Sequence, residues 1–454
     1  MSALPENWIE TEIGGLCSLK NGRAFKPNEW QTSGLPIVRI QNLNNSAFAF
    51  NHFQGEVDER NRLRGGELLF AWSGTPGTSF GAHVWRGGEA VLNQHIFRVD
   101  FDEALLDKRF FRSAINQKLT ELIDVAHGGV GLRHVTKGVF EKTLVALPPR
   151  PEQTRIADQL DTLLARVQAC NNRFDAIPAL LKRFRQTVLD AAVSGSLTHS
   201  WRVERNAANW SATTVQSICQ RRRVITYGVV KLGDVVPNGT PCLRTSNVRW
   251  LRFELDGMKR IAPSLSAEYS RTILRGGEVL VNVRGTLGGV AVAGNEMVGW
   301  NISREVAVLP IDQSIVNPHF AAYWVASDAS QKWLAGMEKG IAYVGINIED
   351  LRNLPIRLPS LPEQAEIVRR VEALFAMADR IEARCTAARA QAQRLTPLVL
   401  AKAFRGELVP QDPSDEPASE LLARIALSNT APTGKSKQKV PLAPKQRAQV
   451  AITL

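Results

Sequence analysis

The sequence is poor in groups that could build a disulfide framework or a metal site. Its 454 residues include five cysteines, which never form a CxxC pair, and seven histidines without metal-ligand spacing. Disulfide-dense domains belong to oxidising compartments, so this pattern favours free thiols in a reducing one. We therefore expect a cytoplasmic location and no metal bound by the chain.

Long apolar runs are also missing. No stretch approaches the roughly 20 apolar residues that cross a bilayer, and the opening MSALPENWIETEIGG lacks the basic-then-apolar order of a secretory signal. Acidic residues are in deficit, because 44 Asp and Glu face 56 Lys and Arg, for a formal net charge of +12. Such an excess favours a polyanionic partner, and without membrane features the leading one is nucleic acid.

What the sequence has instead is a long internal repeat. Residues 151–198 align with 362–409 without a gap, at an offset of 211, and 15 of the 48 positions are identical. Shorter pairs of similar segments precede these two ranges at offsets between 202 and 211, among them LRGGELL at 63–69 and LRGGEVL at 274–280. The changing offset predicts loops of different length in two copies of one fold.

The repeat divides the chain into two variable globular parts and two helical tails. We place the globular parts at 1–150 and 205–360, and the tails at 151–204 and 361–426, the second with a short final helix. The basic stretch 427–454 contains no acidic residue, and we expect it to be disordered.

The globular parts carry both strand and helix signals. The runs EVLVNVRGT, GGVAVAG and REVAVLP place β-branched residues between glycines, which is typical of strands. Residues 108–122 and 318–334 have helical spacing. Each globular part is therefore predicted to be mixed α and β, with a sheet topology that the pattern leaves open.

Each tail predicts a long helix with a coiled-coil seam. Apolar residues recur at alternating steps of four and three over 156–188 and again over 367–399. A Pro-Glu-Gln sequence opens each tail, with the proline in the favoured first turn. Two ordinary core helices are the plainer alternative, but the strict heptad in both copies favours two helices packed against each other.

Each tail has a glycine near the end of its apolar pattern and a proline inside the pattern. Gly195 and Gly406 follow the last apolar residues, as C-caps would. Pro178 and Pro397 lie inside the apolar patterns, where we expect each helix to kink or break.

Catalytic motifs of nucleic-acid enzymes are missing. No GxxxxGK[ST] phosphate loop occurs, and RGTLGG at 284–289 lacks the lysine. The sequence NPHF at 317–320 superficially resembles a methyltransferase motif, but the other copy has DKRF at 107–110, so a helix start explains both better. We expect no catalytic residue. An enzyme with an unrecognised nuclease or methyltransferase site and a purely structural coiled-coil adaptor are the alternatives.

The order of these features resembles the specificity subunits of type I restriction-modification systems. The resemblance rests on two variable domains, each followed by a helix that opens with Pro-Glu-Gln, and on FRGEL at 404–408 and DEPA at 415–418. It extends over residues 1–426.

The resemblance implies an α+β fold, in which two target recognition domains are separated by two long helices packed as an antiparallel coiled coil with pseudo-twofold symmetry. Each domain would read one half of an asymmetric bipartite site in double-stranded DNA. The helices would set the gap and hold two copies of the methyltransferase subunit, through which two restriction subunits join. S-adenosylmethionine, ATP and Mg would be used by those partners, and this chain would bind no cofactor. A methylation-only complex is the alternative.

Candidate DNA contacts are polar side chains at predicted strand ends and in glycine-flanked loops. Phosphates are contacted mostly by Arg and Lys, and base edges are read by Arg, Asn, Gln, Ser and Thr. In the first globular part the candidates are Arg39, Gln41, Asn42, Ser73, Thr75, Asn93, Gln94, His95, Arg133 and His134. In the second they are Arg244, Ser246, Asn247, Arg284, Thr286, Asn301, Ser303, Arg304, Tyr343 and Asn347. The alternative for each is a solvated loop residue or a turn cap.

Overall fold

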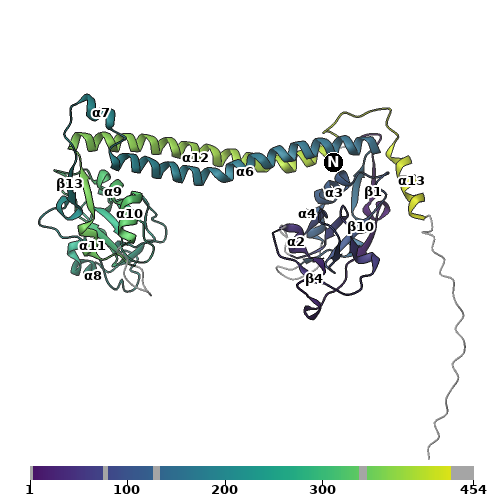
Figure 1. Ribbon diagram of the computed structural model, residues 1–454, viewed down its shortest axis with the longest axis horizontal. Helices are drawn as coiled ribbons and strands as arrows, with labels where there is room; N and C mark the ends of the chain where they lie inside the picture. The colour runs from purple at the N-terminus through teal and green to yellow at the C-terminus, as the bar shows by residue number, and fades with distance from the viewer. Residues whose placement is uncertain (1–3, 46, 75–79, 126–132, 337–344, 431–454) are drawn as a thin grey trace, which may run out of the picture. The chain divides into compact units, whose positions relative to one another are not determined.

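The chain folds into two compact units. Unit 1 comprises residues 1–170 and 391–454, and unit 2 comprises residues 171–390, so each holds part of both long helices. The computed structural model (Figure 1) describes residues 4–45, 47–74, 80–125, 133–336 and 345–430.

The two tails form long helices, as the heptad pattern predicts. Helix α6 spans Arg150–Ser194 and helix α12 spans Leu361–Phe404. Both continue through their internal prolines, so of the expected kink or break at Pro178 and Pro397 the break does not occur. The predicted C-cap glycines are confirmed, because Gly195 and Gly406 have φ values of 80° and 73°, a conformation that glycine adopts without strain.

Within unit 2, the segments of α6 and α12 pack antiparallel. Asp175 pairs with Arg389 at 2.6 Å, and Arg185 pairs with Asp379 at 2.6 Å, so the numbering falls along one helix as it rises along the other. Exposed ion pairs contribute little stability. Burial of seam residues such as Leu181 makes the larger contribution.

Unit 1 contains two four-stranded sheets, ordered β2-β10-β6-β8 and β4-β3-β9-β5, and the pairs β1-β12 and β11-β7. Its strands are β1 Ile9–Glu12, β2 Ser18–Asn21, β3 Leu35–Val38, β4 Asn51–Phe53, β5 Arg62–Leu63, β6 Leu68–Ala71, β7 Ser73–Gly74, β8 Gly81–Val84, β9 Ala90–Leu92, β10 Ile96–Asp100, β11 Arg133–His134 and β12 Leu144–Leu147. Its shorter helices are α1 Ile13–Leu16, η1 Pro27–Glu29, α2 Ile40–Asn44, η2 Glu59–Asn61, α3 Lys108–Gln117, α4 Leu119–Asp124, α5 Lys137–Lys142 and α13 Ala418–Thr430.

Unit 2 repeats this plan with the sheets β14-β22-β19-β20 and β18-β15-β21 and the pairs β13-β23 and β16-β17. Its strands are β13 Ser211–Thr214, β14 Thr226–Tyr227, β15 Thr240–Leu243, β16 Val248–Arg249, β17 Arg252–Phe253, β18 Lys259–Ile261, β19 Val279–Asn282, β20 Val290–Val292, β21 Asn301–Ile302, β22 Val306–Leu309 and β23 Pro355–Leu358. Its shorter helices are α7 His199–Glu204, η3 Val215–Ile218, α8 Pro263–Glu268, η4 Ser270–Thr272, η5 Asn295–Met297, α9 Pro318–Ala326, α10 Asp328–Ala335 and α11 Ile348–Asn353.

These elements agree with most of the sequence predictions. The three strand-like runs contain β19, β20 and β22, and each predicted helical segment holds two successive helices, α3 with α4 and α9 with α10. Asn317 is the N-cap of α9, since its side chain accepts a hydrogen bond from the His319 amide, so NPHF is a helix start as expected. The boundary of the basic tail is corrected, because α13 continues to Thr430. Residues 431–454 lie outside the described part of the chain.

The glutamine of each Pro-Glu-Gln fastens a long helix to its globular part. Gln153 is fully buried, accepts a hydrogen bond from the Asp107 amide at 2.9 Å and donates to the Pro148 carbonyl at 3.0 Å. Gln364 does the same in unit 2 with the Asn317 amide at 2.8 Å and the Pro359 carbonyl at 2.9 Å. The amide side chain has one acceptor and two donors, which suits this junction of backbone groups.

The glutamate of the motif is also buried, and here the two units differ. Glu152 accepts hydrogen bonds from Trp8 Nε1 at 2.9 Å and Gln411 Nε2 at 2.6 Å. Burial raises the pKa of Glu152 above its ordinary value, against the effect of these bonds. Glu363 instead meets the Arg202 guanidinium at 2.8 Å. The motif therefore joins each helix to segments distant in sequence.

Replacing Gln364 with alanine should destabilise the protein, because it leaves the Asn317 amide and the Pro359 carbonyl buried without their partner. We expect a loss of about 2–4 kcal/mol in the free energy of unfolding, measured by urea titration of the full chain. The matched control is Gln391→Ala at an exposed position of α12, which should change it by less than about 0.5 kcal/mol. Equal midpoints for the two variants would contradict this role.

Candidate nucleic-acid interface

Two parallel strands in each unit bring predicted DNA-contacting segments together. Strand β3 pairs in parallel with β9, and β15 pairs in parallel with β21. The carboxyl ends of parallel strands meet at one edge of a sheet. Accordingly, the Asn93 amide donates to the Val38 carbonyl at 3.1 Å, and the Ser303 amide donates to the Leu243 carbonyl at 2.8 Å.

Two more predicted segments join the same edge through backbone hydrogen bonds. In unit 1 the Trp72 amide donates to the His95 carbonyl at 3.3 Å, and the Val135 amide donates to the Trp72 carbonyl at 2.9 Å. In unit 2 the Val283 amide donates to the Glu305 carbonyl at 2.9 Å, and the Ile346 amide donates to the Val283 carbonyl at 2.8 Å. Four loops thus converge in each unit.

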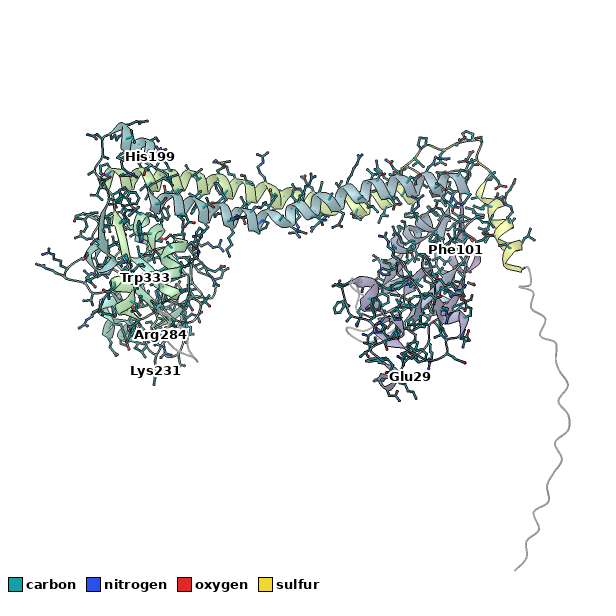
Figure 2. All side chains as sticks on the ribbon, in the orientation of Figure 1. Glu29, Phe101, His199, Lys231, Arg284 and Trp333 are labelled. Atoms are coloured by element: carbon teal, nitrogen blue, oxygen red, sulfur yellow. The ribbon has the colours of Figure 1, made fainter. Side chains whose placement is uncertain are left out.

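We call this region the loop edge. In unit 1 it comprises residues 39–42, 72–73, 93–95 and 133–134. In unit 2 it comprises residues 244–247, 283–286, 303–305 and 345–347. Figure 2 labels Arg284, which lies at the end of unit 2 that is far from α6 and α12.

A glycine holds a fifth segment against the loop edge in each unit. A Cβ atom on Gly22 would lie 2.0 Å from the Asn93 carbonyl oxygen, and one on Gly228 would lie 1.8 Å from the Ile302 carbonyl oxygen. Both approaches are too close for any side chain, so only glycine fits. These glycines were missed as a sequence signal, although they occupy equivalent positions in the two copies.

In unit 1 the loop edge carries imidazoles around an indole. Ser73 Oγ and His134 Nδ1 are 2.9 Å apart, and Gln94 Nε2 lies 3.1 Å from His95 Nε2. The Trp72 ring lies 5.4 Å from the His95 ring and 5.8 Å from the His134 ring, between centroids. Desolvation by burial, and then the nearby His134, lower the pKa of His95 below its ordinary value, which favours a neutral ring with one donor and one acceptor.

In unit 2 the loop edge carries arginines instead. The Arg284 guanidinium lies over the Tyr227 ring, 5.6 Å from its centroid, in a cation–π arrangement. Beside it is a hollow of about 600 Å³, whose lining residues are Tyr227, Val283, Arg284, Arg304, Gly345, Ile346, Asn347 and Ile348. The Asn347 side chain accepts from the Glu349 amide and caps α11, which leaves its amide nitrogen available.

Three predicted asparagines have structural roles. Asn42 and Asn247 are buried, and their side-chain oxygens accept from the backbone amides of Arg39 and Arg244 at 3.2 and 3.0 Å. Asn301 is fully buried and bonded to neighbouring backbone and side-chain groups. Burial removes these amides from any surface that a duplex could reach, so the structure does not support their prediction as DNA contacts. Their alternative as turn caps explains Asn42 and Asn247.

The remaining candidates differ in exposure. The buried hydroxyls of Ser73 and Ser303 are at the loop edge but offer little surface. Gln94, Ser246, Thr286, Arg304 and Asn347 are exposed, whereas Gln41, Asn93, His95, His134 and Arg284 are half-buried. Arg39 lies over the Trp30 ring at 5.1 Å, and Arg244 donates to the Gly257 carbonyl at 2.9 Å. The backbone of Arg133 pairs with Gly74. Thr75 and Tyr343 lie outside the described residues.

Two aromatic residues, one in the loop edge and one beside it, were missed as sequence signals. Trp72 and Tyr227 carry the ring contacts of the predicted His95 and Arg284. Trp72 directly precedes the predicted Ser73, but Tyr227 is distant in sequence from Arg284, and no local pattern links them.

Over the described ranges, no cluster of three or more His, Cys, Asp or Glu could hold a metal ion. Nor does any described helix have the length and apolar character to cross a membrane.

Comparison with known proteins identifies the family. The model of the type I restriction modification DNA specificity domain matches residues 5–178 and 226–387. The chain belongs to this family. The two matched ranges show that the specificity domain occurs twice, in agreement with the internal repeat.

Relatives of this specificity-domain chain match it over nearly their whole length. It is 33% identical to the EcoBI specificity subunit of Escherichia coli, over 96% of this chain and 95% of that protein. It is 28% identical to the EcoKI specificity subunit of Escherichia coli strain K12, over 96% and 98%.

Solved structures share its fold. The HsdS subunit from Thermoanaerobacter tengcongensis aligns with a TM-score of 0.58 and 20% identity, over 89% of this chain and 98% of that one. A chain from a structure of the type I R-M system, described in terms of complex assembly and conformational transition, aligns with a TM-score of 0.62 and 18% identity, over 89% and 99%. The predicted α+β fold is confirmed.

The imidazoles of the specificity domain in unit 1 give a pH-dependent signal. Replacing His134 with asparagine removes a charge that disfavours protonation of His95, so the pKa of His95 should rise, while burial still holds it below the ordinary value. A pH titration of imidazole resonances by NMR measures this. His83 is the control, because its lowered pKa is caused by burial and Arg112. A fall in the pKa of His95, or an equal shift of His83, would contradict the arrangement.

Proposed function

We propose that this chain is the specificity subunit of a type I restriction-modification complex, in which each unit reads one half of an asymmetric bipartite site in DNA. The observation that carries the proposal is the loop edge. The same four backbone segments converge in both units, but matching positions carry different side chains, with Ser73 and Gln94 in unit 1 where unit 2 has Arg284 and Arg304. A shared frame with different side chains suits two half-sites of different sequence. The net charge of +12 suits a polyanionic partner.

The long helices are proposed to set the gap between the half-sites and to bind two copies of a methyltransferase subunit, through which two restriction subunits join. Large apolar side chains on these helices support a docking role. In unit 2, Leu180 is 60% exposed and Met377 is 49% exposed, and in unit 1, Leu398 is 60% exposed. Large apolar side chains left exposed on a helix are available to a protein partner.

Catalysis is proposed to belong to the partner subunits. They would use S-adenosylmethionine, ATP and Mg in the cytoplasm, while this chain supplies the choice of sequence and binds no cofactor. The carboxylates that the motif buries, Glu152 and Glu363, are engaged by hydrogen bonds or by an ion pair inside the fold. Their positions fit a structural role better than a catalytic one.

Methylome sequencing tests the proposal directly. Cells that express the chain with its methyltransferase should show a bipartite methylated motif that is absent when the chain is omitted. Exchanging residues 1–150 for the equivalent part of a relative should change one half of that motif and leave the other intact, because each unit has its own loop edge. A motif that needs no specificity chain would contradict the proposal, as would a simultaneous change of both halves.

Lengthening both helices should lengthen the gap. Four residues inserted after Asp175 and four inserted before Arg389, which the ion pair places opposite one another, add about 6 Å of helix and turn the seam by only about 40°. We expect the same half-sites with a gap longer by one or two base pairs, each about 3.4 Å. Paired two-residue insertions rotate the seam by about 200° and should abolish activity. An active four-residue variant with the original gap would rule out the helices as the spacer.

A further inference from the structure

Two arginines of unit 2 occupy the backbone positions of a serine and a glutamine of unit 1. Ser73 pairs with His134 across β7 and β11, and Arg284 forms the matching bridge with Gly345. Arg304 is the second residue after the end of β21, as Gln94 is the second after the end of β9. The two units therefore present different hydrogen-bonding groups from equivalent places.

Arg284 is held in place by its surroundings. Its amide donates to the Glu305 carbonyl at 3.3 Å, which ties its backbone to the loop after β21. Its guanidinium rests over Tyr227, and its half-buried side chain has restricted freedom. A Cβ atom on Gly345 would lie 3.4 Å from Arg284 Cγ, so the glycine leaves room that His134 fills in unit 1. A planar donor group that is fixed before binding loses less entropy on forming a bidentate contact.

Neither arginine has its charge neutralised within the described ranges, in contrast to Arg223, which pairs with the buried Glu278 at 2.7 Å. Arg304 differs from Arg284 in that it is exposed, and among the described residues no aromatic ring lies beneath its guanidinium. Both line the same hollow of about 600 Å³. Unpaired arginines at a concave edge are suited to an anionic, hydrogen-bonding ligand.

We propose that Arg284 reads a guanine in the half-site recognised by unit 2, and that Arg304 contacts a phosphate beside it. This inference rests on the proposed function. Guanine offers two acceptors, O6 and N7, in the major groove, and a fixed guanidinium matches both at once. An exposed, unsupported arginine suits a phosphate contact, which positions the duplex without reading it.

The two roles predict different consequences of mutation. Loss of a base-reading arginine relaxes specificity at one position, whereas loss of a phosphate contact weakens binding to all sequences and reduces its salt dependence. Arg284→Lys keeps the charge but removes the bidentate geometry. We expect it to reduce discrimination for the guanine roughly 5- to 150-fold and to leave the other positions unchanged.

The experiment uses the complex of the chain with its methyltransferase, assayed by methylome sequencing. The half-site of unit 2 is the one that survives exchange of residues 1–150, and it should contain a guanine. Arg284→Lys should methylate sites degenerate at that guanine, and Arg304→Gln should keep the full motif. In binding assays, Arg304→Gln should make the negative slope of log affinity against log salt shallower by about 0.9. Gln94→Ala is the matched control, since Gln94 belongs to unit 1 and its replacement should leave the half-site of unit 2 unchanged.

A binding measurement on the wild-type complex tests the guanine contact even if the variants lose activity. Duplexes carrying 7-deazaguanine at the proposed position lack the N7 acceptor, and they should bind the wild-type complex at least about fivefold more weakly. A half-site of unit 2 without guanine, a fully stringent Arg284→Lys variant, or equal affinity for the 7-deazaguanine duplexes would overturn the assignment while the proposed function stands. A wild-type complex without any bipartite motif would instead remove the proposed function itself.

Discussion

The attachment of each long helix to its globular part depends on one buried glutamine. Gln153 and Gln364 each connect the end of the strand before the helix to the start of another helix of the same unit. A buried amide without these partners would be costly, so the bonds constrain the direction in which the long helix leaves the sheet. The loop edge of each unit lies in the same compact unit as this junction.

Within each unit, the buried core and the loop edge have separate roles. Buried residues such as Phe70 in unit 1 and Phe320 in unit 2 fix the sheets, and the sheets fix where the loops meet. Since three backbone hydrogen bonds of the loop edge recur in both units, its side chains can differ without disturbing the frame. Trp72 and Tyr227 then orient the polar groups beside them.

The sequence predicts structure well where a physical period or a repeat carries the signal. The heptads of α6 and α12 and the strand character of β19 were readable because packing imposes a regular spacing of apolar residues. Individual site residues were harder to predict. An asparagine in a loop can cap a turn or contact a ligand, and only the structure shows that Asn42 and Asn301 are buried. The contact of Tyr227 with Arg284 depends on tertiary folding, so no local pattern could reveal it.

The glutamine junction also bears on how such a chain could change its target during evolution. On the side of the globular part, every partner of Gln153 and Gln364 is a main-chain group: the amides of residues 107 and 317 and the carbonyls of residues 148 and 359 among them. Any amino acid supplies a carbonyl, and any except proline supplies an amide. The contacts of the glutamine therefore place little demand on the sequence of the incoming domain, and recombination near residue 150 or residue 361 could graft a foreign domain onto an unaltered helix, provided that Glu152 keeps a donor such as Trp8.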